Sequence, residues 1–358
     1  MAKNLNLDPI TFTGRQIESM KEAFWTAVFL NPQISTLLLV VPGIKAKQQV
    51  VILGMLGLVG KKKGPNCKPD VSDEQIDAIE KWWDPEYIED RFEECWKDLL
   101  GKFTAWGLKN GIDKADLTGT EFALFLEDRI ATALAESVYR IAFFGDKTID
   151  NIADGGVLKD GVDLRYFNAI NGYWKQLFAI ATAQPDLHVS IAKNAGATVA
   201  AQKFTAQDTT DQVATGILES MVAQADERLL ADPNVGFILT KSFADQYKRE
   251  RKKATGFELP YLRVEQGIKV LEYDGIPLYV LSIQDRIIKS YMTGTKSNLP
   301  HRVILTTIAS NLQLGVEEES DLSALDAFYD KTEKTYIIDT GYSIDAMVVE
   351  DHMTVSAY

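Results

Sequence analysis

The segment closest to a chemical motif is GMLGLVGKKKG at positions 54–64. A phosphate-binding loop requires Gly, four residues and then Gly-Lys-Ser/Thr, because backbone N–H groups hold the phosphates and the hydroxyl holds magnesium. Counting back from Gly60-Lys61 places Met55 where the first glycine is needed, and Lys62 replaces the hydroxyl. We therefore predict no nucleotide site here. The lysines fit a solvated turn or a contact with another subunit.

Other residues able to do chemistry lack partners in the sequence. His188, His301 and His352 have neither the i, i+4 spacing nor the neighbouring carboxylates of a zinc site. Ser343, in GYSID, lacks the second glycine of a nucleophile elbow. We predict no catalytic residue, no cofactor and no metal.

The charged segments favour solvated surfaces. YKRERKK at 247–253 is typical of the exposed end of a helix, with a salt-bridge contact to an acidic segment such as VEEESD (316–321) and nucleic-acid binding as the alternatives. A net charge of −13 argues against nucleic-acid binding as the main task, because that binding depends on Lys and Arg.

The composition predicts a globular protein. Of 358 residues, 46% are apolar and 25% charged, which is enough for one or two packed cores. Cys67 and Cys95 are too few for a disulfide framework and favour a reducing compartment. The first residues contain no apolar signal core, and the longest apolar run, VVILGMLGLVG, is shorter than the roughly 20 residues of a membrane span. We expect a soluble, intracellular protein.

One long helix is predicted over 119–146. No Gly or Pro interrupts Thr120 to Phe144, and apolar residues recur at steps of three and four, including Ala133 and Val138. Such a helix would extend roughly 37 Å, and Gly145 can end it at C′. We interpret it as the spine of a wide subunit.

Two apolar regions need a cover. The N-terminal segment and the hairpin predicted from Lys47 to Trp83 carry large apolar side chains that would be costly to leave in water, and an isolated hairpin is marginally stable. The chain could fold these regions onto itself, but a long hairpin followed by a long helix favours a contact with a neighbouring subunit. The predicted interface residues are Phe24, Trp25, Phe29, Val51, Ile52, Leu53, Met55, Lys61, Lys62 and Lys63.

The remaining segments predict a mixture of helices and strands. Helices are expected over 85–108, YFNAINGYWKQLFAIA and 208–231, and a strand followed by a helix in PNVGFILTKSFADQYKRERKKATG. Asp274-Gly275 predicts a hairpin, and RVILTTIASNLQLGVE and the C-terminal segment read as strands. The class is α+β, with a boundary near 148.

This order of elements resembles the major capsid proteins of tailed phages, which have the Hong Kong 97-type fold. That family has an N-terminal arm, an extended β-hairpin loop, a peripheral domain with a long spine helix, an axial domain, and final strands that return to the peripheral domain. The resemblance assigns these parts to 1–36, 37–84, 85–148, 149–331 and 332–358. It rests on FTGRQIESMKEAFWTAVFLNP, KQQVVILGMLGLVGKKKGPNCKPDVSDEQIDAIEKWW, GTEFALFLEDRIATALAESVYRIAFFGD and KTYIIDTGYSIDAMVVEDHMTVSAY.

The resemblance implies a non-enzymatic shell protein that assembles into pentamers and hexamers around double-stranded DNA. It further implies separate scaffolding, portal and decoration proteins, DNA packaged without sequence-specific binding, no membrane partner, and a virion location after assembly in the host cytoplasm. Some members crosslink a lysine of the extended loop, but no matching Asn and Glu accompany Lys61–Lys63. The alternatives are an encapsulin-type nanocompartment shell and an α/β-type enzyme with an unrecognised site.

Overall fold

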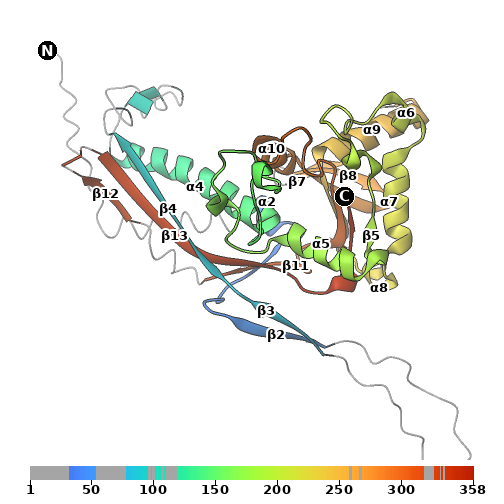
Figure 1. Cartoon of the computed structure of the whole chain (residues 1–358), viewed down its shortest axis with the longest axis horizontal. Coiled ribbons are helices and arrows are strands. Elements are labelled where there is room, and N and C mark those ends of the chain that lie inside the picture. The colour runs from blue at the N-terminus through green and yellow to red at the C-terminus, as the bar shows by residue number, and fades with distance from the viewer. Residues whose placement is uncertain are drawn as a thin grey trace, which may run out of the picture.

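The computed structural model describes residues 32–53, 78–95, 119–257, 260–265, 268–317, 326–330 and 335–358, with positions 98, 101, 102, 104, 105, 109, 332 and 333 besides. These residues form helices and three separate β-sheets, so the predicted α+β class is confirmed. In Figure 1 an elongated half contains the long helix, a compact half contains the largest sheet, and a hairpin projects below. Within the described ranges, no helix combines the length and hydropathy that crossing a membrane would require.

A seven-stranded mixed sheet forms the compact half. Its strand order is β5 (His188–Val189), β14 (Thr354–Ala357), β10 (Val303–Thr307), β6 (Val235–Thr240), β9 (Ile276–Leu281), β8 (Ile268–Tyr273) and β7 (Arg263–Glu265). β8 and β9 are joined at Asp274 (φ 49°) and Gly275 (φ 80°), which confirms the predicted hairpin.

Helices cover both faces of this sheet. Phe237 and Leu239 pack with α7 (Val213–Gln224) and α9 (Lys241–Thr255). Ile238, between them in sequence, packs on the other face with α5 (Tyr173–Ala183), α10 (Ser282–Tyr291) and the end of the long helix. This alternation follows from the two-residue period of a strand. The strand-then-helix prediction for β6 and α9 is confirmed.

A five-stranded sheet lies beside the long helix α4 (Gly119–Phe144). β13 (Thr335–Val348) is its centre, with β4 (Glu86–Cys95) along one edge and β12 (Asp326–Asp330) and β11 (Leu312–Val316) in turn along the other. β1 (Leu39–Val41) pairs with β11. Tyr342 of β13 is buried against α4, where its hydroxyl lies 3.2 Å from Ser137 Oγ.

The long helix is confirmed, with two corrections. Its second half buries Leu134 and Val138, as the spacing predicts, but Ala133 is exposed. Gly145 does not end the helix in a left-handed conformation, because its φ is not positive. Its role is close approach: a Cβ there would lie 2.6 Å from Ile170 O, and Gly172 N–H donates to Gly145 O at 2.9 Å. Glycine lets the ends of α4 and α5 touch.

The helix predicted over 85–108 is wrong in its first part, because 86–95 form strand β4, whereas the described positions 98, 101, 102, 104 and 105 are helical as predicted. Ile88 and Phe92 are four residues apart, a spacing that fits a helix and equally fits one face of a strand. Both residues are partly buried against the core, and β4 pairs with β13 over ten residue pairs. This long-range pairing decides between the two periods.

Two further helices are shorter than predicted. The 208–231 region is divided into α6 (Ala206–Thr210), α7 and α8 (Glu227–Ala231), with Gln212 left-handed at φ 52° between the first two. In YFNAINGYWKQLFAIA only the part from Tyr173 is helical, and it begins after Gly172. Within the described ranges the remaining short elements are α2 (Pro32–Ser35) and 3-10 turns at Ile152–Asp154, Leu164–Tyr166, Pro185–Leu187, Ala192–Ala195 and Asp351–Met353.

The third sheet is the projecting hairpin of β2 (Gln48–Leu53) and β3 (Ala78–Trp83). Its strands are antiparallel, as the sequence predicts, and pair from Gln48 with Trp83 to Leu53 with Ala78. The end carrying Trp83 joins the body, and we call this end the hairpin root.

Candidate subunit interface

The register of the hairpin separates its two faces. Residues directly opposite one another share a face, and neighbours along a strand alternate. Val50, Lys81 and Trp83 therefore belong to one face, and Val51, Glu80 and Trp82 to the other. Trp83 is 2% exposed and Trp82 is 49% exposed, so the first face is turned to the body and the second outward.

The hairpin root is packed on its inner face. Trp83 forms a small buried cluster with Ile44 and Met347, and Val50 packs against it. Gly315 makes room for the indole, because a Cβ there would lie 2.9 Å from its ring carbons. The root therefore has a fixed seat on β11 and β13.

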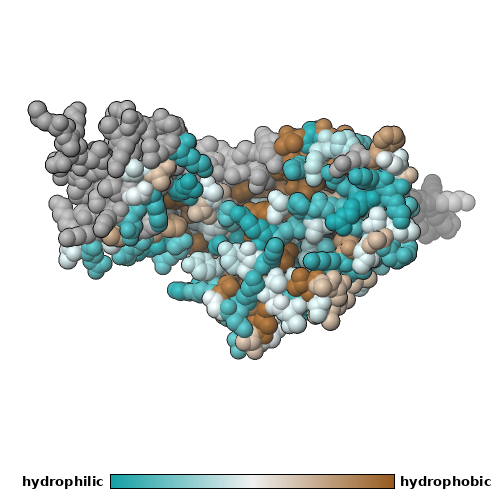
Figure 2. All heavy atoms as spheres, turned by 90° about the horizontal axis from the view of Figure 1, so that it is seen from above, coloured by the Kyte–Doolittle hydropathy of each residue, from teal (hydrophilic) through white to brown (hydrophobic). Residues whose placement is uncertain are grey.

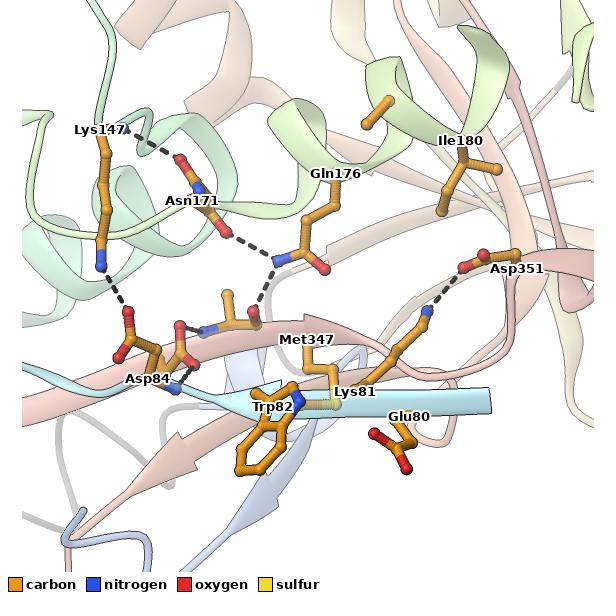
Figure 3. Close-up of a pocket in the computed structure, with 13 residues that line it drawn as sticks. Glu80, Lys81, Trp82, Asp84, Lys147, Asn171, Gln176, Ile180, Met347 and Asp351 are labelled. Atoms are coloured by element: carbon orange, nitrogen blue, oxygen red, sulfur yellow. Dashed lines mark hydrogen bonds and ion pairs between the residues drawn. The ribbon is translucent and has the colours of Figure 1, made fainter. Parts of the chain in front are cut away.

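Polar contacts fix the same strand to β13 and to the turn that follows it (Figure 3). Lys81 Nζ donates to Val348 O and Asp351 Oδ1, both at 2.6 Å. Gln176 of α5 donates to Ala346 O at 2.6 Å and accepts from Val348 N–H at 2.9 Å. Gln176 thus completes the edge of β13 beyond the end of β4, and Lys81 ties the hairpin to that edge.

Two carboxylates with different surroundings lie where β3 leads into β4. Lys147 donates to Asp84 at 2.9 Å, and this hydrogen bond lowers the pKa of the largely exposed Asp84. Asp345 accepts from Asp84 N–H at 2.7 Å and from Ala346 N–H, yet its burial raises its pKa. Asp345 therefore acts mainly as a buried acceptor that holds the backbone of the root.

The outward face offers apolar surface next to a groove. Val51 is 51% exposed, and Lys47 Nζ lies 5.8 Å from the centre of the Trp82 ring. An open groove of about 400 Å³ lies between β3 and α5, where Trp82 and Glu80 point away from Lys81 (Figure 3). An exposed aromatic ring and apolar Val51 beside charged residues suit contact with another protein surface.

The structure accounts for the predicted interface residues unevenly. Val51 lies on the outward face, and Ile52 and Leu53 lie in β2, opposite Ile79 and Ala78, with only their backbones described. The other predicted residues lie outside the described ranges: Phe24, Trp25, Phe29, Met55, Lys61, Lys62 and Lys63. Their assignment stays a prediction.

Sequence reasoning missed the residues that hold the root. Lys81 and Asp351 are 270 positions apart, and Gln176 and Ala346 are 170 apart, so no local pattern connects them. One signal was present in the sequence. Two adjacent tryptophans in a strand must face opposite sides, so Trp82 and Trp83 could not both be buried against the body.

The remaining surface shows no arrangement typical of a reaction centre in the described residues. They contain no group of three or more His, Cys, Asp or Glu able to hold a metal ion. A second groove, of about 520 Å³, lies between β4, β13 and the 163–166 turn, and two Arg–Asp pairs line it: Arg91 with Asp339, and Arg165 with Asp163. Seen from above, the surface is mostly hydrophilic, with hydrophobic residues in small separate groups (Figure 2).

No protein-family model and no curated protein sequence matches the chain. Solved structures are similar to it over most of its length. The satellite phage P4 procapsid with its size determination protein shares 12% identity over 97% of this chain and 98% of that chain, with a TM-score of 0.47. Mycobacterium phage Ogopogo shares 14% over 90% and 89%, with a TM-score of 0.49. The holo-SrpI encapsulin complex from Synechococcus elongatus shares 11% over 89% and 84%, with a TM-score of 0.46. Because these scores are below 0.5, the functional assignment rests on the elements and contacts of the chain itself.

Proposed function

We propose that this chain is a shell-forming structural protein, the major capsid protein of a tailed phage with the Hong Kong 97-type fold. In this function it assembles into pentamers and hexamers that close into an icosahedral head around double-stranded DNA. The observation that carries the proposal is the projecting hairpin. Its root is fixed by Trp83 and Lys81, while Val51 and Trp82 on its other face are half exposed.

Because its root is fixed, the hairpin can extend from the subunit in a defined direction. A two-stranded sheet without a third strand is marginal in water, so the chain gains stability when the outward face is covered. Covering it with a different region of a second copy gives a heterologous contact, and such contacts close into rings or shells when the rotation permits. The long helix and the five-stranded sheet beside it stiffen the subunit from which the hairpin projects.

In this function the chain is divided into five parts and has defined partners and a defined location. Its parts are the arm 1–36, the extended loop 37–84, the peripheral domain 85–148, the axial domain 149–331 and the returning strands 332–358. The role is non-enzymatic. The partners are further copies, with separate scaffolding, portal and decoration proteins and DNA held without sequence-specific contacts. The location is the virion, after assembly in the host cytoplasm.

Electron microscopy of the purified, concentrated protein tests this function. We expect closed shells of uniform diameter, and that diameter separates a phage head from a small encapsulin-type compartment. A monomer that stays monodisperse in micrographs and in sedimentation at high concentration would rule the proposal out.

A pair of variants sharpens the test. Val51→Lys adds a charge to the outward face but places it opposite Glu80, so the subunit should keep its melting temperature while shell yield falls. Val199→Lys is the matched control, because Val199 is exposed in the compact half. Equal shell yields for the two variants would remove the hairpin from the interface.

A further inference from the structure

A second exposed apolar surface lies at the β7 edge of the seven-stranded sheet. Phe257, Leu262 and Val264 are 79%, 60% and 64% exposed, the three highest values among the large apolar side chains that the structure describes. Among the described residues β7 pairs only with β8, so it is the edge strand of the sheet. An apolar open edge is a ready template for another chain. We call these residues with β7 the β7 edge.

The β7 edge has a basic rim. Positions 248–269 contain seven of the chain's 38 Lys and Arg but only three of its 51 Asp and Glu. One of the three, Glu250, is buried and accepts hydrogen bonds from the N–H groups of Ala214 and Thr215. Lys248 and Lys269 lie 4.3 and 5.1 Å from the centre of the Tyr261 ring. The rim is therefore positive on a chain whose net charge is −13.

The opposite combination occurs on β4. This ten-residue strand contains five acidic residues and a single basic one, Arg91, which is already paired with Asp339 at 2.6 and 2.9 Å. Glu89 and Glu93 are exposed. Within the described part of the chain, β4 pairs only with β13, so its other edge is also open. We call this strand the β4 edge.

The two edges lie in different halves of one molecule. β4 runs along the elongated half beside α4, and β7 is the edge strand of the seven-stranded sheet in the compact half (Figure 1). We propose that the β7 edge of one copy docks against the β4 edge of a second copy, with the basic rim facing the acidic strand. Complementary charge fixes the partner, and the contact is head-to-tail, so it can repeat around a ring. The inference rests on the proposed function only in its use of repeated copies.

Nucleic acid fits the β7 edge less well. Phosphate binding depends on Lys and Arg, and the exposed aliphatic side chains of Leu262 and Val264 add nothing to it. An open strand edge likewise offers hydrogen-bonding groups that match a second protein backbone.

The sign of charge at position 264 tests the contact. Val264→Asp should lower subunit association, measured by sedimentation velocity, by about tenfold or more, because it sets like charges against the β4 edge. Val264→Lys loses the same apolar contact but keeps the favourable sign, so its loss should be only about twofold. Val199→Asp is the control at an exposed position that belongs to neither strand and whose backbone N–H donates to Thr295 O. All three should melt at the wild-type temperature.

Mixing variants tests the pairing directly. Val264→Asp copies and copies carrying Glu89→Lys with Glu93→Lys should each associate poorly alone, but should associate with one another. Association that is equal for all variants, or no recovery in the mixture, would overturn the inference. Loss of DNA retention with normal association would assign the edge to nucleic acid instead. Wild-type subunits that associate through these edges without forming shells would keep the inference and remove the proposed function.

Discussion

The compact half and the hairpin root both bury polar groups, but the two regions differ in how completely the chain covers them. Around His301 every partner comes from the same half: Asn194 exchanges hydrogen bonds with its backbone at 2.7 and 3.0 Å, and Gln202 bridges to Ser297. At the root the polar groups of one strand face reach β13 and Asp351, while the opposite face has no cover within the described structure. The chain itself therefore covers the polar groups around His301. The hairpin root is packed on one face only.

The adjacent residues Trp82 and Trp83 differ in burial in the same way as the two regions. Trp83 belongs to a core and Trp82 to a surface, although residue type, strand and neighbours are nearly the same. The amino-acid composition therefore indicates that apolar surface must be covered. The register of strand pairing shows which of these residues the chain covers itself. Substitutions at the two faces should separate folding from assembly.

The largest effect is expected for Trp83→Ala. Removing a buried indole from the cluster with Ile44 and Met347 should lower the free energy of unfolding by about 3–5 kcal/mol, because it leaves a cavity that rigid strands cannot fill. Denaturant unfolding of the dissociated subunit measures this loss. A change below about 1 kcal/mol would mean that the root is not a core.

The next effect concerns the contact between α4 and α5. A Cβ at Gly172 would lie 2.5 Å from Ala142 O and 2.9 Å from Gly145 N, both backbone atoms, so Gly172→Ala should cost about 1–3 kcal/mol. Gly216→Ala is the control, because Gly216 lies in α7 with no atom within 4 Å of the added carbon. That variant should gain about 0.5–1 kcal/mol. Equal melting temperatures for the two variants would contradict the close approach.

The sequence predicts the elements that depend on local patterns but not the contacts between distant parts of the chain. The long helix, the hairpins at Gln48–Trp83 and Asp274-Gly275, and the pair β6 and α9 follow from periodicity and turn residues, which act over a few positions. β4 did not, since its spacing fits two periods and only pairing with β13 selects one. The root could not be predicted for the same reason: its contacts join Lys81 and Gln176 to positions 170 or more residues away. Val51 was selected from apolar content, which is local information, and its place in an interface stays a prediction.

A smaller effect should appear as a pH dependence of the compact half. His301 Nε2 lies 2.8 Å from Gln202 O and must donate to it, while Nδ1 lies 3.0 Å from Ser242 Oγ. Burial lowers the His301 pKa, and the charge of Lys193 acts in the same direction. The unfolded chain therefore binds the proton more readily than the folded one. Stability is complete above the unfolded value of 6.5 and is lost as the pH falls through it toward the folded pKa.

The measurement is the free energy of unfolding from pH 8 to pH 5 for the wild type and His301→Gln. The variant should be less stable at pH 8 but should lose less on acidification. His188, whose pKa burial also lowers, contributes to both curves and cancels in the difference. Parallel curves would show that His301 is not the titrating group.

The smallest effect on the subunit is expected for Trp82→Ala, the counterpart of Trp83→Ala. Half of the Trp82 surface is already in water, and Lys47 Nζ lies 5.8 Å from the centre of its ring, so the free energy of unfolding should change by no more than about 0.5 kcal/mol. Assembly should respond differently, because an exposed tryptophan on a rigid strand is the kind of residue that anchors an interface. We expect the yield of shells in sedimentation to fall sharply, and Trp82→Phe to recover part of it by restoring apolar area. If Trp82→Ala destabilised the subunit as much as Trp83→Ala, both rings would belong to one core and the distinction between the two faces would be lost. If it left both stability and shell yield unchanged, the outward face of the root would not be a contact between copies. Any contact made by the hairpin would then involve residues beyond the root.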